Sequence, residues 1–326
     1  MSVSAPERFV WIARARGIGI MLVVVGHCLR GLVRAGILPA DAMTAAIDRA
    51  IYSFHMPLFF FLSGLTFAAS AGRQTVAGFL SGRMVRLLWP LFLWTWIFFA
   101  LQALAGDSIN SAPEPFPWFP LPPRLHFWFL WALLLIHLTV FTALRGGVAG
   151  VAAAVAAVVT GYILLRSQPS AFVWIGPALY NLVFFLTGLA ASGGGWIPRL
   201  VGGEASAGRA AFGGAIFLCA VGWATFGPLP FGLGAALAIA AIVGLVLVVA
   251  QVFRAGPVSD FLVLCGRMSM LIYLAHTIFS AGIRIGLVSA GITAWPAHLL
   301  LGILAGMAGP MVLSELARRG GFSHMR

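Results

Sequence analysis

The sequence contains no lysine, and it has few charged residues of any kind. Of its 326 residues, 61% are hydrophobic and only 9% are charged, and the mean hydropathy is +1.01. Water-soluble domains carry about 25% charged residues, so this chain has too few charges to cover a soluble surface. A membrane offers the backbone no water, and such a chain must therefore fold there as helices or as a closed barrel.

The short segments of alternating polarity that a membrane barrel requires do not dominate this chain. Its apolar runs are long and continuous, and about 20 apolar residues suffice for a helix to cross the hydrocarbon core. We therefore predict an all-α, polytopic integral membrane protein with about ten transmembrane helices. The predicted spans are 12–32, 51–71, 85–105, 127–144, 147–166, 172–191, 210–227, 231–252, 258–281 and 296–315.

Paired cysteines and a cleavable leader are also missing from the pattern. Cys28, Cys219 and Cys265 lie in or beside apolar runs, without the spacing of a disulfide framework or a zinc motif. Arg14 and Arg16 precede an apolar run that has no small-residue cleavage site, so we expect this run to be retained as a span. No stretch has the composition of a soluble domain, and residues 1–326 are predicted to form a single transmembrane domain.

The basic residues behind the net charge of +12 are all arginines, and they sit in short loops between the apolar runs. This pattern favours the positive-inside rule over nucleic-acid binding. With the N-terminus in the cytoplasm, the inner arginines are Arg8, Arg14, Arg16, Arg73, Arg83, Arg86, Arg145, Arg199, Arg209, Arg254, Arg267, Arg318, Arg319 and Arg326. The outer ones are Arg30, Arg34, Arg49, Arg124, Arg166 and Arg284. This excess predicts that both termini are cytoplasmic and loop 106–126 is outside, in a bacterial-type inner membrane.

Ionisable residues inside the spans are costly and indicate function. Arg16 and His27 lie eleven residues apart in the first span, which brings them to one face of a helix at a distance of roughly 16 Å. His55 lies near the outer end of the second span, and Pro57 behind it is expected to kink that helix. His276 approaches the outer half of the ninth span, so helix order predicts a similar depth for the three histidines.

Ser269, Tyr273 and His276 follow each other at helical spacing on one face of the ninth span. Each intramembrane histidine has a structural alternative, a hydrogen bond that joins two helices, and we interpret His137 and His298 in this way. A three-histidine zinc site lacks the ligand spacing and the acidic partners such a site uses, so no metal is expected. Arg83, Arg86 and Arg267 are each also explained as topology anchors.

Several of these segments together resemble one known family. The stretch from Arg16 to His27 resembles the Arg–ten residues–His signature of the membrane-bound acyltransferase 3 family, in its fucose 4-O-acetylase-related branch. Residues 54–64, 126–130 and 266–276 are similar, in the same order, to the second-helix, Trp-Phe-Leu and late Ser…Tyr…His segments of that family. The resemblance therefore covers the whole chain.

The resemblance implies ten transmembrane helices and transfer of an acyl group, usually acetyl from acetyl-CoA, to a hydroxyl of a sugar or another acceptor. The Arg–His pair that the family needs corresponds to Arg16 and His27. Many members have Asp three residues before the arginine, where this chain has Ala13. Some members also carry a periplasmic esterase-like domain; without one, the acceptor must itself reach the membrane pocket.

The chemistry of acyl transfer assigns roles to these residues. Histidine suits a general base near neutral pH, so His27 acts on the acceptor hydroxyl or carries the acyl group transiently. Guanidinium groups bind phosphates, which suits Arg16, Arg83, Arg86 and Arg267 for the phosphates of CoA at the inner face. Ser269 and Tyr273 are candidate oxyanion donors or acceptor ligands. His55 and His276 are expected to support catalysis or to bind the acceptor.

The sequence thus predicts a membrane-embedded O-acyltransferase that moves an acyl group, acetyl in the simplest case, from acyl-CoA to a sugar hydroxyl of a cell-surface or exported glycan. Acyl-CoA is expected as donor substrate, without a tightly bound cofactor. Other interpretations stay open: the acceptor is a small molecule or a lipid, the protein is a transporter or flippase of a lipid-linked sugar, or it is a structural membrane subunit. Paired broken helices in repeated halves, typical of transporters, are not evident.

Overall fold

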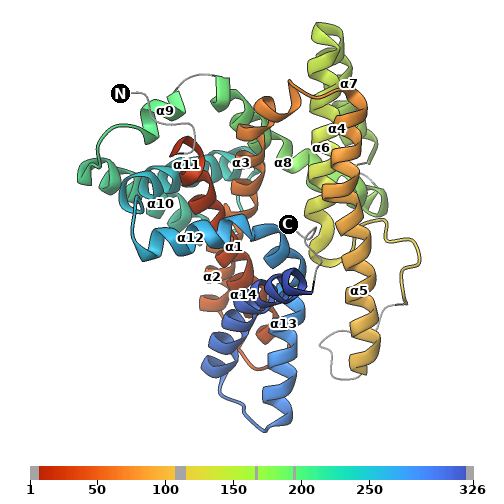
Figure 1. The fold of residues 1–326 in the computed structure, drawn as a ribbon, viewed down its shortest axis with the longest axis vertical. Coiled ribbons are helices and arrows are strands. Elements are labelled where there is room, and N and C mark those ends of the chain that lie inside the picture. The colour runs from red at the N-terminus through yellow and green to blue at the C-terminus, as the bar shows by residue number, and fades with distance from the viewer. Residues whose placement is uncertain (1–6, 107–114, 166–167, 194–195, 321–326) are drawn as a thin grey trace. The chain divides into compact units, whose positions relative to one another are not determined.

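A computed structural model describes residues 7–106, 115–165, 168–193 and 196–320, and this part of the chain is helical, without strands (Figure 1). The all-α fold class predicted from the apolar runs is confirmed. The helices are α1 (Glu7–Arg34), α2 (Ala42–Tyr52), α3 (His55–Ala71), α4 (Val76–Arg83), η1 (Met84–Leu88), α5 (Trp89–Ala105), η3 (Leu125–Phe127), α6 (Trp128–Arg145), α7 (Gly147–Leu165), α8 (Pro169–Gly193), α9 (Trp196–Val201), α10 (Ala207–Ala224), α11 (Phe231–Val252), α12 (Pro257–Arg267), α13 (Ser269–Ser289) and α14 (Trp295–Arg319).

Within the described residues, nine stretches are helical, long and apolar enough to cross a membrane. They are Val10–Arg34, Ala42–Ala71, Val76–Ala105, Leu125–Arg145, Phe172–Gly193, Ala207–Ala224, Phe231–Val252, Ser269–Ser289 and Trp295–Arg319. The predicted fifth span, 147–166, corresponds to α7, whose apolar described part, Gly147–Gly161, is shorter. The protein is a polytopic membrane protein, and α7 would make the count the even number that two termini on one side require. The orientation itself stays a prediction.

The predicted ninth span, 258–281, is wrong in its bounds. The chain forms two helices there, because α12 ends at Arg267 and α13 begins at Ser269. Met268 between them has φ −92° and ψ 5°, outside the helical region. Hydrophobicity alone does not reveal this break, since the residues on both sides of it are apolar. The membrane-crossing helix is α13, and α12 is a separate short helix.

Pro57 does not kink a helix, as we had expected it to. The break lies before it, because α2 ends at Tyr52 and α3 begins at His55. Pro57 therefore falls in the first turn of α3, where an N–H group has no partner within the helix and its loss costs little. The break places His55 at the very start of a helix.

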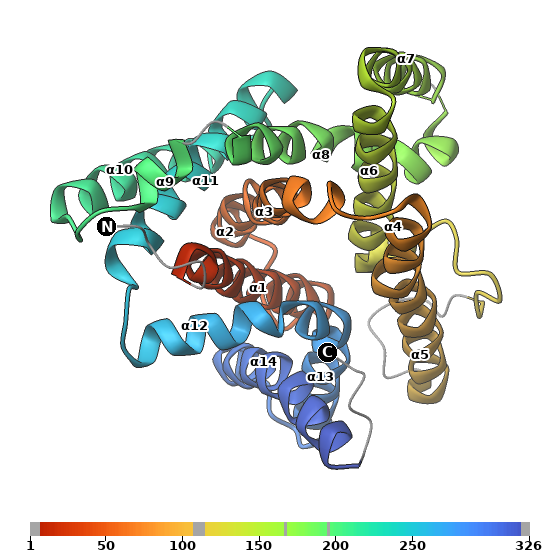
Figure 2. The ribbon, with the colours of Figure 1, turned by 45° about the horizontal axis from the view of Figure 1, so that its top comes forward.

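The described chain forms two compact units, and each is a bundle of helices with its own packing. The first unit comprises residues 7–59 and 196–320, and the second comprises 60–106, 115–165 and 168–193. In the first unit α10 lies beside α11, and α13 lies beside α14 (Figures 1 and 2). The prediction of a single domain over 1–326 stays a prediction.

Glycines bring the helices of the first unit into backbone contact. A Cβ atom added to Gly17 of α1 would lie 2.1 Å from the carbonyl oxygen of Leu262, and one added to Gly266 of α12 would lie 1.8 Å from that of Ala13. Atoms never approach that closely, so only glycine allows this crossing. Ala13, where relatives often have Asp, therefore lies at the close contact between α1 and α12.

The second unit uses the same device between α3 and α8. A Cβ added to Gly64 would lie 1.9 Å from the carbonyl oxygen of Phe185, and one added to Gly188 would lie 2.0 Å from that of Phe61. Aromatic rings fill the remaining space, and Phe79 of α4 stacks on Phe141 of α6 at 3.8 Å between ring centroids. The described part of the predicted outer loop packs on α5, where Trp96 donates to the carbonyl of Pro117 at 3.1 Å. Residues 107–114 of that loop lie outside the described residues.

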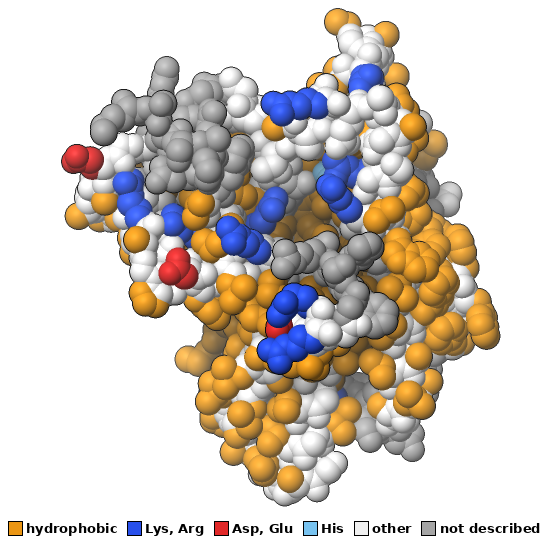
Figure 3. Space-filling view, in the orientation of Figure 1, with side chains coloured by type: hydrophobic (Ala, Val, Ile, Leu, Met, Phe, Trp, Pro, Cys, Tyr) orange, Lys and Arg blue, Asp and Glu red, His pale blue; other side chains and the backbone are white. Residues whose placement is uncertain are grey.

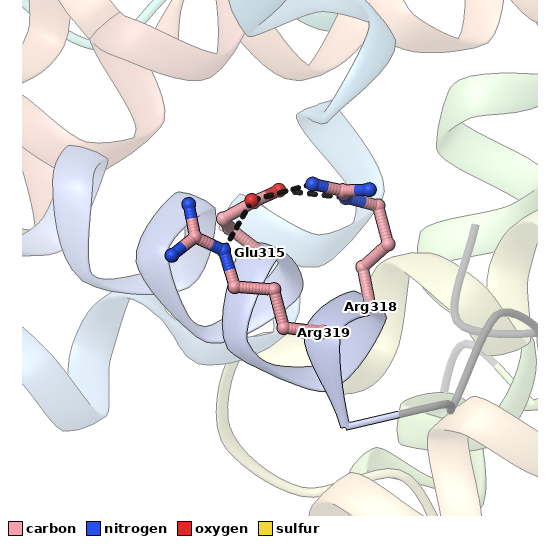
Figure 4. Close-up of polar contacts among 3 residues, drawn as sticks. All are labelled: Glu315, Arg318 and Arg319. Carbon is pink, nitrogen blue, oxygen red and sulfur yellow. Dashed lines mark hydrogen bonds and ion pairs between the residues drawn. The ribbon is translucent and has the colours of Figure 1, made fainter.

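The surface has the composition that a lipid environment requires. Hydrophobic side chains cover most of the face drawn in Figure 3, and arginines form separate groups on it. One group ends α14, where Arg318 binds Glu315 through two hydrogen bonds of 2.8 and 2.6 Å and Arg319 adds a third of 2.8 Å (Figure 4). Such an arginine pair at a helix end is typical of a topology anchor.

Candidate functional site

Helix α1 carries Arg16 and His27 without a break, so the predicted spacing applies to an uninterrupted α-helix. The helix is fixed in the first unit by the Gly17 and Gly266 crossing with α12. On its outer half it meets α14, because a Cβ on Gly306 would lie 2.8 Å from the side chain of Val24. His27 is therefore presented from a helix whose position is set by backbone contacts on two sides.

Four rings from four helices gather around His27. Its ring centroid lies 5.0 Å from that of His276 on α13 and 6.4 Å from that of Tyr52 at the end of α2. The Tyr52 ring lies 4.5 Å from the ring of His55, the first residue of α3. We refer to His27, Tyr52, His55 and His276 as the ring cluster. The structure thus brings together the three histidines that helix order put at similar depth, with Tyr52 between two of them.

Backbone carbonyls define how two of these histidines hold their protons. The Nδ1–H of His55 donates to the carbonyl of Ile51 at 2.7 Å. The Nδ1–H of His276 donates to the carbonyls of Ile272 and Tyr273 at 2.9 and 2.8 Å. A carbonyl oxygen only accepts, so Nδ1 carries the proton in both rings and Nε2 carries the lone pair of the neutral form. Both side chains are almost fully buried, whereas His27 is half-buried.

Tyr52 and its neighbours were missed by the sequence reasoning. Arg30, one turn after His27 on α1, binds Asp48 of α2 through two hydrogen bonds of 2.6 and 2.8 Å. The Cζ atom of Arg30 also lies 3.2 Å from the centroid of the Tyr52 ring. The spacing of Arg30 from His27 was the available signal, since residues three apart share a helix face. The acidic partner and the tyrosine, on another helix, had none.

Arg16 differs sharply from its neighbour Arg14. Arg14 is engaged, because its Nε donates to the Ser259 hydroxyl at 2.9 Å and its Nη2 to the Arg254 carbonyl at 2.6 Å. Arg16 is half-buried, yet within the described residues it has no hydrogen bond or ion pair. A cation in a membrane helix normally has a partner. The geometry of Arg16 therefore suits binding of an anionic group that is not part of the chain.

The other predicted residues of the first unit lie around the junction of α12 and α13. Arg267 is the exposed last residue of α12, and Ser269 is the half-buried first residue of α13. Tyr273 is buried one turn further along, and its carbonyl accepts the bond from His276. Cys265 in α12 is buried, which raises the pKa of its thiol to about 11 and makes it a poor nucleophile.

Arg83 and Arg86 belong to the second unit, so the predicted CoA-binding arginines are divided between the two units. Arg83 ends α4, and its Cζ atom lies 4.7 Å from the centroid of the Phe79 ring. Arg86 lies in η1, a π-helical turn inside the span 76–105. Turns of this kind occur frequently at functional sites.

The second unit also holds a polar pair without a predicted function. The hydroxyl of Ser63 on α3 and Nε2 of His137 on α6 lie 2.9 Å apart. The His137 ring packs against Phe67 and Phe185 at 5.1 and 5.4 Å. This bond joins two helices, which is the structural role that the sequence suggested for His137. In the described part of the chain, no group of three or more His, Cys, Asp or Glu residues is placed to hold a metal ion.

Comparison with known proteins gives the family. The profile of the family described as "Acyltransferase domain", acyltransferase 3, matches residues 9–315. Two similar relatives are named Nodulation protein NolL: that of Mesorhizobium japonicum is 29% identical over 136 residues, 40% of this chain, and that of Sinorhizobium fredii is 29% identical over 133 residues, 41% of this chain.

Each of these matches covers 36% of the relative's own length. No solved structure matches the chain. The family profile, in contrast, covers nearly all of it, including Arg16, the ring cluster and the arginines of the second unit. The chain belongs to the acyltransferase 3 family, and it carries an acyltransferase domain built from membrane helices.

Proposed function

We propose that the protein is an O-acyltransferase of a bacterial-type inner membrane. It transfers an acyl group, acetyl in the simplest case, from acyl-CoA on the cytoplasmic side to a sugar hydroxyl of a cell-surface or exported glycan. The observation that carries this proposal is the pairing on α1 of a half-buried arginine without a partner among the described residues and a histidine within a cluster of rings. Arg16 suits the donor phosphates, and His27 suits the chemistry.

The distance between the two residues fits an extended donor. Eleven residues of α-helix measure roughly 16 Å, which is of the order of the slender arm between the nucleotide and the thioester of CoA. The nucleotide is highly charged and stays at the membrane surface, whereas the arm can enter a less polar environment. Arg16 therefore holds the charged end, and the thioester carbon reaches the depth of His27. Arg83, Arg86 and Arg267 are proposed as further phosphate ligands.

The reaction needs one base and one leaving group. His27 takes the proton of the acceptor hydroxyl while the oxygen attacks the thioester carbon, and a tetrahedral intermediate forms. The intermediate collapses, the carbon–sulfur bond breaks, and CoA leaves as a thiol after it receives that proton. His55 and His276 each present Nε2 with a lone pair in the neutral form, which suits them to accept a hydrogen bond from the acceptor's hydroxyls.

Labelled acyl-CoA tests this proposal directly. Purified protein in liposomes, supplied with acetyl-CoA and a panel of glycans, small alcohols and lipids, should transfer label to a hydroxyl of one acceptor class. Arg16→Lys keeps the charge but loses the planar fork, so it should raise the KM for the donor. Arg34→Lys, an exposed position on the same helix, is the matched control and should not change it.

The outcomes separate the interpretations. Label on a small molecule or a lipid alone would replace the glycan with that acceptor. Movement of a lipid-linked sugar across the bilayer without consumption of acetyl-CoA would identify a flippase and refute acyl transfer. Equal donor KM values for wild type, Arg16→Lys and Arg16→Ala would remove Arg16 from donor binding.

A further inference from the structure

Tyr52 occupies the centre of the ring cluster. It is the last residue of α2, and its ring lies 4.5 Å from the ring of His55 and 6.4 Å from that of His27, edge-on to both. The ring also rests on α1, because a Cβ added to Gly26 would lie 2.9 Å from its Cε2 atom. The tyrosine therefore touches the residue next to His27 and both histidine rings, and it is fixed from three sides.

An ion pair holds the fourth side. The Cζ atom of Arg30 lies 3.2 Å from the ring centroid of Tyr52, which puts the cation over the ring face and leaves the ring edge with the hydroxyl to other partners. Asp48 in turn holds the guanidinium by two bonds. Asp48 and Tyr52 are one turn apart on α2, so helix and ion pair together fix the orientation of the ring.

The hydroxyl of Tyr52 stands out from this well-packed environment. Its oxygen is buried, and within the described residues it has no hydrogen-bond partner. A buried polar group without a partner costs about 1–3 kcal/mol, and tyrosine hydroxyls usually find a partner when buried. Hydroxyls of the membrane helices such as Thr95 and Thr187 avoid this cost by donating to a carbonyl of their own helix. A side chain held this firmly, with its donor unused, is suited to a ligand that completes the site.

We propose that the hydroxyl of Tyr52 donates a hydrogen bond to the carbonyl oxygen of the acyl group during transfer. This inference rests on the proposed function. As the acceptor oxygen bonds to the thioester carbon and its proton passes to His27, the carbonyl π pair moves onto the oxygen, which becomes negative. Tyr52 stabilises this oxyanion. When the carbon–sulfur bond breaks, the carbonyl re-forms, and the leaving sulfur takes the proton from His27.

An unused donor beside a base has a clear catalytic advantage. Interactions that exist only in the transition state accelerate a reaction, whereas those present throughout do not. Tyr52 meets this condition, because its hydroxyl has nothing to give up before the ligand arrives. Ser269 and Tyr273 were the candidates from sequence spacing, and Tyr52 takes the oxyanion role from them in this proposal.

Tyr52→Phe removes only the hydroxyl and keeps the ring that packs on Gly26 and the histidines. We expect kcat for acetyl transfer to fall about 10²–10³-fold, as for loss of one oxyanion donor. The KM for acetyl-CoA should stay the same, since the hydroxyl acts only in the transition state. The melting temperature in detergent should stay the same or rise, because an unpaired buried hydroxyl is removed. Tyr180→Phe, at a half-exposed position of the second unit, should leave all three values unchanged.

Three outcomes would overturn the proposal. Wild-type kcat in Tyr52→Phe, with transfer by the wild type intact, refutes the oxyanion role and leaves the proposed function standing. A loss of kcat in Tyr273→Phe but not in Tyr52→Phe assigns the role to Tyr273. A wild-type protein that transfers no acyl group to any acceptor refutes both the function and the role of Tyr52. A lower melting temperature together with the kcat loss would indicate a structural role, which also contradicts the proposal.

Discussion

In the first unit, Gly17 and Gly266 let α1 and α12 touch backbone to backbone, and in the second Gly64 and Gly188 do the same for α3 and α8. Both units are therefore built around a crossing that tolerates no side chain. They differ in their polar groups. The ring cluster of the first unit joins α1, α2, α3 and α13, whereas Ser63 and His137 of the second unit form one bond between α3 and α6.

The difference teaches how to separate a structural histidine from a functional one in a membrane. His137 bonds to a hydroxyl of a neighbouring helix, as expected of a residue that joins helices. The Nδ1–H groups of His55 and His276 bond to carbonyls of their own helix turn, so these bonds join no helices and leave Nε2 for chemistry. On this basis the first unit contains the reacting residues.

The largest effect is expected from His27→Ala. Loss of a general base lowers the rate by about 10²–10⁴-fold, and the half-buried position allows an alanine without a large loss of stability. His137→Leu in the second unit should keep turnover within a few-fold of wild type. Turnover and CoA binding measured on the same purified variants check this. Wild-type turnover in His27→Ala, or a collapse in a folded His137→Leu, would reverse our assignment of the two units.

Next in size are the glycine crossings. Gly266→Ala and Gly64→Ala each put a methyl group about 2 Å from a backbone oxygen, and the helices must separate. Overpacking of this kind costs typically about 1–3 kcal/mol, and a rigid backbone neighbour puts both variants at the upper end. Melting in detergent should show similar losses for both. Gly214→Ala, with open space around it, is the control and should be neutral or stabilising. A tolerant Gly64→Ala would end the parallel between the units.

A smaller effect is expected from Ser63→Ala, which leaves Nε2 of the buried His137 without its bond. The free energy of unfolding should fall by about 1–3 kcal/mol while kcat changes little. Thr187→Val, whose hydroxyl bonds only to its own helix, should cost less. A hundredfold loss of kcat in a Ser63→Ala protein of normal stability would instead make Ser63 and His137 a catalytic pair.

The smallest effect is expected from Asp48→Asn. Asp48 and Arg30 are partly exposed, so their ion pair contributes at most about 1 kcal/mol to stability. Its loss loosens the ring of Tyr52, and we expect kcat to fall by up to about fivefold, the equivalent of about 1 kcal/mol. Arg145→Lys in the second unit, where the guanidinium lies over Phe141, should leave kcat unchanged. Equal values for both variants would show that the ion pair does not act on the ring cluster.

The sequence predicted those features that depend on one helix at a time. Arg16 and His27 share a face because helical periodicity requires it, and His276 approaches His27 because the order of spans fixes depth. Tyr52 escaped notice because it ends a helix and meets its partners only in three dimensions. The break at Met268 carries no proline or glycine of its own, and the close approach of Gly266 to Ala13, two residues earlier, depends on another helix.

The π-helical turn η1 has a consequence for the register of the span that contains it. A π-turn holds one residue more than an α-turn, so deletion of one residue within 84–88 would let an ordinary α-helix run on. All residues after it would rotate by about 100° relative to Arg83. Leu91, Thr95 and Phe99, now buried along one side of α5, would leave their packing partners. A single-codon deletion here would therefore be far more harmful than any one substitution in the same turn.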